Sequence, residues 1–279
     1  MNIPKPVSGR VAVCSWSLQP ASPEELALKL RAAGVRRVQL ALDPLRQKPA
    51  VWGQTQQVFE HNQISIISGM FGCVGEDYST LESIRATGGL APDATWPQNL
   101  KNIIETVALS EKLGLKLVTF HAGFLPHDKA DPVFAKMLRR LGETADAFGA
   151  AGIDVALETG QETARDLARL LLELDRRNAG INFDPANMIL YDKGNPVEAF
   201  RLLGPWVRQV HIKDALRTKT PGTWGQEVPA GSGEVDWPRF FEILKGLNYS
   251  GPFVIEREAG GQRLADIVRA RELIEKQLR

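Results

Sequence analysis

Four short apolar runs each end on a residue that can bind a metal ion: DVALE (154–158), INFD (181–184), RQVH (208–211) and FVIE (253–256). Segments of helical pattern separate the runs, so we expect parallel strands whose carboxyl ends meet at one edge of a sheet. The residues that end the runs are Glu158, Asp184, His211 and Glu256. Three carboxylates and one imidazole at one edge form a ligand set for a divalent cation.

A simpler interpretation of each acidic residue is a helix cap or a solvated loop position. The chain has 33 acidic residues and 4 histidines among 279 residues. Residues of these types at four given positions are therefore expected by chance about 3 times in 10,000. The pattern favours one functional site over four unrelated caps.

The alternation of strand and helix extends over the whole chain. Eight strand candidates are each followed by a helical segment: Val11–Trp16, Arg37–Leu42, Ile64–Gly69, Leu115–His121, Asp154–Glu158, Ile181–Asp184, Arg208–Ile212 and Phe253–Glu256. Eight βα units in about 250 residues are typical of a (β/α)8 barrel, whose functional groups lie at the C-terminal ends of the strands. We predict an α/β fold, a single TIM-barrel domain spanning residues 1–279.

Capping residues mark several of the expected helix starts. Ser22, Asp131 and Asn195 each precede a proline, and Thr159 with Glu162 matches a capping box. A doubly wound sheet is the competing architecture. However, the turn after the first run, CSWSLQPAS, contains no glycine-rich motif, so neither a dinucleotide fold nor a P-loop is supported.

Composition argues against several classes of partner. The net charge is +1 and no basic run is present, so we expect no nucleic acid partner. The N-terminal stretch MNIPKPVSGR has no apolar core, and no stretch approaches the ~20 apolar residues of a membrane span. We therefore expect a cytoplasmic protein without a membrane partner. A homo-oligomer is left open. Cys14 and Cys73 are interpreted as buried small hydrophobic residues.

Two connections are unusually long, and both follow the carboxyl end of a strand, at residues 70–98 and 214–235. Long ordered loops in compact domains are often functional. Four aromatic residues in them would either cover a small polar ligand or pack under their own loops: Phe71, Tyr78, Trp96 and Trp224.

The donor set itself narrows the choice of metal. Three oxygen ligands and one nitrogen suit Mn²⁺, Mg²⁺, Co²⁺ or Zn²⁺ with positions left open for a substrate, and they do not suit a thiolate-preferring metal. We expect one divalent ion, with Mn²⁺ as the first choice.

Six motifs along the chain carry a family resemblance: FHAG (120–123), ALETGQE (156–162), NFDPANM (182–188), QVHIKDA (209–215), GSGEVDW (231–237) and FVIERE (253–258). With these motifs the sequence resembles the xylose isomerase-like TIM-barrel superfamily over nearly its whole length. Members include ketose 3-epimerases, sugar-phosphate isomerases and epimerases, inosose isomerases and dehydratases, and endonuclease IV. The resemblance implies that Glu158, Asp184, His211 and Glu256 hold one divalent ion.

The family chemistry implies a metal-dependent sugar isomerase or epimerase (EC class 5) acting on a ketose, a keto-inositol or a related polyol. The metal would polarise a carbonyl group, one of Glu158 and Glu256 would remove the neighbouring proton, and the other would return a proton to the opposite face of a cis-enediolate. A metal-dependent dehydratase of a keto-sugar or inosose, and a non-catalytic sugar-binding barrel, are the alternatives.

Four further residues are candidate substrate ligands. Asn187 and Arg217 match the D-x-x-[HN] and H-x5-R patterns of related epimerases. His121 and Lys213 would bond substrate hydroxyl groups, or else serve as a loop anchor and a solvated lysine. With only 4 histidines and no Asp-x-His after His211, the chain departs from the three-zinc endonucleases, and we expect no such activity.

Overall fold

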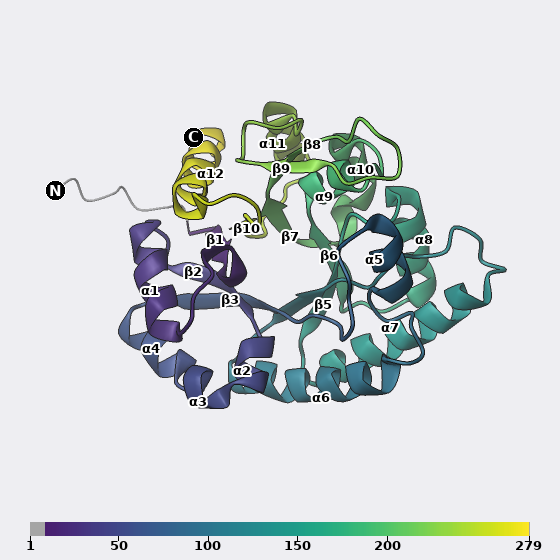
Figure 1. The fold of residues 1–279 in the computed structure, drawn as a ribbon, viewed down its shortest axis with the longest axis horizontal. Helices are drawn as coiled ribbons and strands as arrows, with labels where there is room; N and C mark the ends of the chain where they lie inside the picture. Colours follow the sequence, from purple (N-terminus) through teal and green to yellow (C-terminus); the bar gives the residue numbers. More distant parts are fainter. Residues whose placement is uncertain (1–8, 279) are drawn as a thin grey trace.

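The computed structural model describes residues 9–278, which form a closed barrel of eight parallel strands (Figure 1). The order around the barrel is β1-β10-β7-β6-β5-β4-β3-β2. The strands are β1 (Val11–Cys14), β2 (Arg37–Ala41), β3 (Ser65–Met70), β4 (Leu117–Phe120), β5 (Asp154–Glu158), β6 (Ala179–Phe183), β7 (Val207–Ile212) and β10 (Phe253–Ile255). The predicted (β/α)8 barrel is confirmed. Residues 1–8 of the N-terminal stretch MNIPKPVSGR lie outside the described residues.

Helices surround the barrel, as Figure 1 shows. They are α1 (Pro23–Ala32), α2 (Asp43–Gln47), α3 (Pro49–Trp52), α4 (Thr55–His61), α5 (Leu81–Thr87), α6 (Trp96–Lys112), α7 (Pro132–Ala150), α8 (Ala164–Leu174), α9 (Pro185–Leu190), α10 (Pro196–Leu203), α11 (Trp237–Gly246) and α12 (Arg263–Gln277). Within residues 9–278, none of these helices combines the length and the apolar character needed to cross a membrane.

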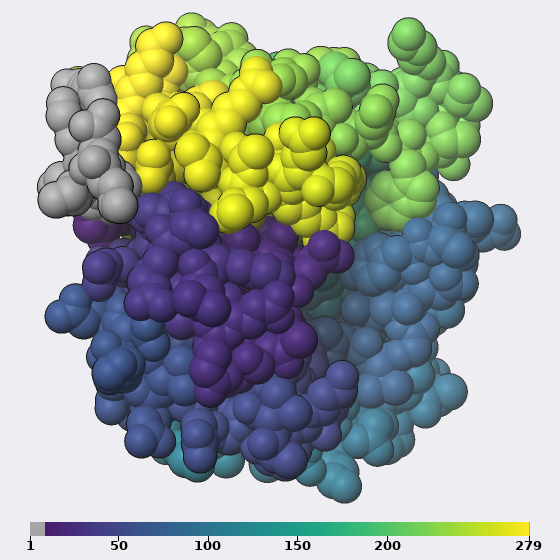
Figure 2. All heavy atoms as spheres, turned by 60° about the vertical axis from the view of Figure 1, so that its left-hand side comes forward, coloured from purple at the N-terminus to yellow at the C-terminus, as the bar shows by residue number. Residues whose placement is uncertain are grey.

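The barrel closes where the two ends of the chain meet. Strand β1 pairs with β2 on one side and with β10 on the other, and Val13 faces Val38 and Ile255 in the two ladders. Figure 2 shows the yellow C-terminal segment packed directly on the purple N-terminal segment. The strand ends that carry the metal-ligand candidates therefore belong to one continuous rim.

Each strand divides its side chains between the barrel interior and the helical layer, because successive residues point to opposite faces. In β6, Phe183 packs outward against Phe200 of α10 and Phe240 of α11, with ring centroids 5.0 and 5.8 Å apart. Asn182 points inward and contacts His211 of the neighbouring strand at 3.0 Å. Both faces are buried, as expected for a parallel barrel.

Most of the predicted helix starts are confirmed. The side chains of Ser22, Asp131 and Asn195 accept hydrogen bonds from backbone N–H groups in the first turns of α1, α7 and α10. These caps satisfy donors that have no partner within the helix.

The predicted capping box at Thr159 is wrong. Helix α8 begins later, and its cap is Thr163. The Thr159 hydroxyl instead accepts from the backbone N–H of Asp184 at 2.8 Å and donates to its carbonyl oxygen at 3.0 Å. The end of β6 exposes these two backbone groups beside β5, so Thr159 satisfies them, and the chain bends through residues 159–162 before α8 begins.

The two long connections contain structure of their own. The first holds α5, and the second holds an antiparallel hairpin of β8 (Asp214–Leu216) and β9 (Gln226–Val228). The hairpin returns the chain to the start of α11.

Candidate metal centre

The structure brings together the four residues whose convergence the sequence predicts. Glu158 ends β5, Asp184 follows β6 and caps α9, His211 lies in β7, and Glu256 follows β10. One potential ligand atom from each residue lies within 4.8 Å of the others, and all four side chains are buried. Neighbouring strands of one rim supply these residues, which explains their approach despite their distance in sequence.

His211 Nδ1 lies at the centre of the cluster. It is 3.5 Å from Glu158 Oε1, 3.7 Å from Asp184 Oδ2 and 3.4 Å from Glu256 Oε2. Ligand atoms that surround one ion at ~2.0–2.4 Å stand about 3–4 Å apart, so the spacing suits a shared cation. Among the described residues, Nδ1 and Asp184 Oδ2 are both buried without a hydrogen-bond partner. Such orphaned atoms are rare, and one cation would satisfy both.

The charge of the cluster also calls for a cation. Burial alone would lower the pKa of His211, but the negative groups around it hold that pKa well above its ordinary value. Burial raises the pKa of the Cys14 thiol strongly, so Cys14 stays protonated and the carboxylates supply the negative charge. Burial likewise raises the pKa of Asp184. A divalent ion would take over the role of the proton on His211.

A polar layer inside the barrel fixes the orientation of the imidazole. His211 Nε2 lies 2.8 Å from Gln39 Oε1, and because that oxygen can only accept, this contact favours the tautomer with the proton on Nε2. Gln39 is itself held, because its amide donates to Thr119 Oγ1 at 2.8 Å and its oxygen accepts from Gln209 Nε2 at 2.9 Å. With the proton on Nε2, Nδ1 keeps a lone pair for a metal ion, the arrangement that supporting partners impose on metal-binding histidines.

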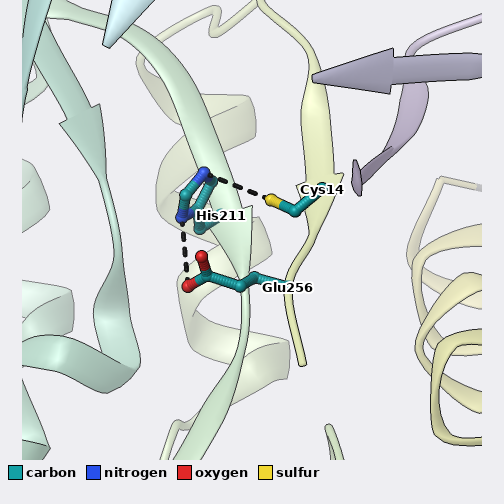
Figure 3. Close-up of side chains that lie close together, drawn as sticks. All are labelled: Cys14, His211 and Glu256. Carbon is teal, nitrogen blue, oxygen red and sulfur yellow. Dashed lines mark hydrogen bonds and ion pairs between the residues drawn. The ribbon is translucent and has the colours of Figure 1, made fainter. Parts of the chain in front are cut away.

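Figure 3 shows His211 between Cys14 and Glu256, with one ring nitrogen directed at each. Cys14 Sγ lies 3.7 Å from Nε2 and 3.4 Å from Gln39 Oε1. Cys14 is fully buried, as predicted, whereas Cys73 is only partly buried. The contact of Cys14 with the imidazole is not visible in the sequence.

The two glutamates have different hydrogen-bond partners. Glu158 accepts from the amides of Asn182 at 3.1 Å and Asn187 at 2.9 Å. Asn187 can approach because residue 160 is glycine with φ 141°, where a Cβ would stand 2.6 Å from the Asn187 Cβ. Glu256 instead accepts from the Trp16 indole at 2.7 Å and from Lys213 at 2.9 Å.

Lys213 donates hydrogen bonds to three side chains in and around the cluster. Its ammonium donates to Asn187 Oδ1 at 3.3 Å, Glu256 Oε2 at 2.9 Å and Glu258 Oε2 at 2.6 Å, so its three protons are all engaged. Burial opposes a charge on Lys213, but the carboxylates keep its pKa well above the ordinary value. Lys213 and His211 in turn hold the pKa of Glu256 well below its usual range, against the effect of burial.

A cavity of about 660 Å³ adjoins the cluster. Its lining consists of Trp16, Ala41, Asp43, Met70, Phe71, Gly72, Glu76, Tyr78, His121, Asn187, Leu190, Trp224, Gly225, Glu227 and Glu258. Three of the four aromatic residues expected over the site are among them. Trp96 is not, because it begins α6 and its ring packs under the Arg140 guanidinium at 4.8 Å.

The predicted substrate ligands lie in different places. His121 and Asn187 line the cavity, and His121 Nε2 is 3.9 Å from Glu158 Oε1. Arg217 does not reach the cavity. It pairs with Asp192 and lies 4.0 Å from Glu234, on the β8–β9 loop, so a substrate role for it stays a prediction without geometric support.

Sequence reasoning missed the residues that support the ligands, above all Gln39 and Trp16. A signal for Gln39 does exist, because it is a polar residue between Val38 and Leu40 in an apolar strand and alternation turns it toward the barrel interior. No local signal marks Trp16, whose partner Glu256 is 240 positions away.

Two curated relatives align with parts of the chain. The uncharacterized protein YihM of Escherichia coli (strain K12) is 28% identical over 138 residues, which cover 49% of this chain and 41% of YihM. The L-ribulose-5-phosphate 3-epimerase UlaE of Salmonella typhi is 26% identical over 193 residues, or 67% of this chain and 66% of UlaE. The chain thus spans about two fifths of the first and two thirds of the second.

Solved structures match over nearly the full chain. The xylose isomerase domain protein of Planctomyces limnophilus is 29% identical with a TM-score of 0.84, covering 98% of this chain and 97% of that one. An L-ribulose 3-epimerase (17%, TM-score 0.74, 96% and 94%) and the probable 3-DHS dehydratase AsbF of Bacillus anthracis (17%, TM-score 0.72, 95% and 98%) share the fold. The family model described as xylose isomerase-like TIM barrel matches residues 28–277, and the chain belongs to that family.

Proposed function

We propose that the protein is a divalent-metal-dependent isomerase or epimerase of a ketose, a keto-inositol or a related polyol. The observation that carries this proposal is the pair of orphaned buried atoms, His211 Nδ1 and Asp184 Oδ2, between two glutamates. Relatives that are sugar epimerases support the same reaction class.

Glu158, Asp184, His211 and Glu256 would hold the ion, and Mn²⁺ is the first choice for this donor set. When bound, the ion would supply Lewis-acid polarisation of a substrate carbonyl group, which acidifies the neighbouring C–H bond.

The chain's own residues would move the protons. Glu158 and Glu256 come from β5 and β10, which lie on either side of β6 and β7 in the barrel, so the two carboxylates can approach a substrate from opposite flanks. One would take the proton from the carbon beside the carbonyl, and the other would return a proton to the opposite face, inverting that carbon.

The remaining residues would orient these groups and the substrate. Asn187 donates to Glu158, and Lys213 donates to Glu256, which fixes both carboxylates. His121 faces the cavity and is the candidate donor to a substrate hydroxyl group. Trp224 and Tyr78 on the cavity wall would exclude water.

A metal-dependent dehydratase is the alternative. It would begin with the same proton removal and then expel a β-hydroxyl group, which His121 on the cavity wall could protonate. A non-catalytic sugar-binding barrel is the third candidate.

A D₂O exchange experiment separates these functions. Mn²⁺-loaded protein is incubated with ketoses and keto-inositols, and NMR follows deuterium uptake and product. Exchange with an epimer or isomer as product supports the proposal, loss of water supports the dehydratase, and binding without exchange supports a non-catalytic sugar-binding protein.

Glu158→Gln and Glu256→Gln should each lower turnover about 10²- to 10⁴-fold, and each variant should incorporate deuterium into a different epimer. Full activity in either variant would assign the proton transfer to another residue.

A further inference from the structure

We infer that the cavity takes an uncharged sugar and rejects sugar phosphates, and that Glu76 and Glu258 set this selectivity. This inference rests on the proposed function. Family membership does not decide the point, because UlaE is named for a phosphorylated substrate and the solved L-ribulose 3-epimerase for a neutral one.

The charged side chains that line the cavity are mostly acidic. Four of the lining residues are carboxylates: Asp43, Glu76, Glu227 and Glu258. Among residues 9–278, no lysine or arginine lines the cavity, and His121 is the one basic side chain that does. A phosphate group is normally bound by arginine, lysine or a row of backbone N–H groups, and this lining offers no arginine or lysine for one.

Three basic residues close to the cavity, Arg46, Arg257 and Lys213, are already engaged by carboxylates. Arg46 pairs with Asp43 at 2.8 Å, and Arg257 pairs with Glu227 at 2.7 Å. All three protons of Lys213 are donated within the chain. A phosphate could recruit one of these cations only by displacing a carboxylate that would then lie unpaired beside it.

Negative charge remains even with a divalent ion in place. The cluster and the lining together hold seven carboxylates: Asp43, Glu76, Glu158, Asp184, Glu227, Glu256 and Glu258. Lys213, Arg46 and Arg257 pair with four of them, and counted with a divalent ion these cations leave two negative charges in excess. A phosphate monoester would add nearly two more in a partly desolvated space.

Glu76 contributes most directly to the repulsion of a phosphate group, because no lysine or arginine pairs with it within residues 9–278. Its carboxylate accepts the backbone N–H of Gly89 at 2.9 Å and faces the cavity. Glu76 is partly buried, so its negative charge is incompletely screened and a second anion beside it would be repelled. Hydroxyl groups of a neutral sugar, by contrast, can donate charge-assisted hydrogen bonds to it.

The test compares each neutral ketose with its phosphate ester. The Mn²⁺-loaded protein is assayed for deuterium exchange with L-ribulose and L-ribulose 5-phosphate, and with D-fructose and D-fructose 6-phosphate. Calorimetric titration of the same compounds measures binding without requiring turnover. We expect the neutral member of a pair to have a kcat/KM, or an affinity, at least about 10²-fold higher.

Glu76→Gln and Glu258→Gln should each reduce this preference by about 10-fold, because each removes one negative charge near the bound ester. The ratio is the readout, since Gln at 258 also loosens Lys213 and lowers both rates. Glu143→Gln, at an exposed position on α7, is the matched control and should leave the ratio unchanged.

The outcomes separate the inference from the proposed function. Ketose phosphates that exchange or bind as well as the free ketoses overturn the inference and leave the proposed function standing. Absence of exchange with these compounds and with the ketoses and keto-inositols of the D₂O experiment, while the neutral sugars still bind preferentially, overturns the proposed function and upholds the selectivity. A ratio unaffected by both Gln variants removes Glu76 and Glu258 as its cause.

Discussion

The two nitrogens of His211 face different surroundings, and this division organises the centre at the scale of single residues. Nε2 meets the oxygen of Gln39 inside the barrel, and Nδ1 faces three carboxylates. Gln39 thus selects the tautomer that can bind a cation. Mutation of a residue that orients a metal ligand typically lowers metal affinity by 10–100-fold.

Replacing Gln39 should therefore weaken metal binding without removing a ligand. We expect Gln39→Leu to raise the Kd for Mn²⁺ about 10- to 100-fold in calorimetric titration, because the Nε2 proton loses its acceptor. Gln63→Leu, on the surface, is the control. Equal Mn²⁺ affinity in Gln39→Leu and the wild type, with both folded by circular dichroism, would show that Gln39 does not position the ring.

Glu162 gives a prediction on pH dependence. It is 6% exposed, and burial raises its pKa to about 8 against the opposing effect of Lys193. The folded state therefore keeps a proton that the unfolded chain releases near pH 4.5. The stability that this proton carries is fully present below about pH 4.5 and is lost as the pH rises through about 8.

Glu162→Gln should remove that loss. Urea unfolding measures the free energy of unfolding at pH 5 and pH 8. Between these two pH values, the variant should become more stable relative to the wild type by on the order of 3 kcal/mol. Glu143→Gln should follow the wild type. Parallel profiles for Glu162→Gln and wild type would mean that Glu162 is not buried in its neutral form.

At the scale of elements, the β8–β9 connection depends on one carboxylate. Asp214 is 1% exposed and accepts from the backbone N–H groups of Gly231 at 2.8 Å, Gly233 at 3.1 Å and Val235 at 3.2 Å. It also accepts from the Trp237 indole at 2.9 Å. The glycine-rich loop is thereby folded back against α11, and the hairpin that carries cavity residues such as Glu227 is held over the rim.

Asp214→Asn should loosen this connection, because an amide has one acceptor oxygen where the carboxylate has two and charge-assisted bonds are stronger. We expect a loss of about 2–4 kcal/mol in the free energy of unfolding and faster proteolysis within residues 217–235. Asp236→Asn is the control, since Asp236 caps α11 and asparagine caps as well. Cleavage and stability like those of the wild type would leave the loop held by other contacts.

At the scale of the whole molecule, the centre links strands from separate parts of the barrel. Its ligands come from β5, β7 and the ends of β6 and β10, and the Trp16 that contacts Glu256 follows β1. An ion bound there would connect the C-terminal strand to the middle of the chain, and it would stabilise the native state alone, because the unfolded chain has no such site.

Metal binding should therefore raise the melting temperature. At Mn²⁺ about 100-fold above its Kd the gain is about 2.7 kcal/mol, which corresponds to about 5–10 °C for a chain of this size. EDTA should reverse the shift, and Asp184→Asn should abolish most of it. Identical melting curves for the wild type in saturating Mn²⁺ and in EDTA would contradict a metal site in this cluster.

Local sequence pattern determined the alternation of eight strands with helices, the barrel and the position of its functional rim. It also determined which four polar residues meet, because a residue at the end of a parallel strand has its place fixed by the strand's register alone. Its error lies where a local motif competes with a distant partner: Thr159 caps no helix because its hydroxyl is bonded to the backbone of Asp184. The substrate role of Arg217, which pairs with Asp192, stays a prediction.

Only the tertiary structure decided what surrounds the four residues. The bond from His211 to Gln39 spans 172 positions and the bond from Trp16 to Glu256 spans 240, so neither leaves a periodic signal in the sequence. Closure of the barrel sets these contacts and gathers carboxylates from separate loops around one cavity. The charge of that cavity is a property of the assembled rim, and a chain with a net charge of +1 does not reveal it.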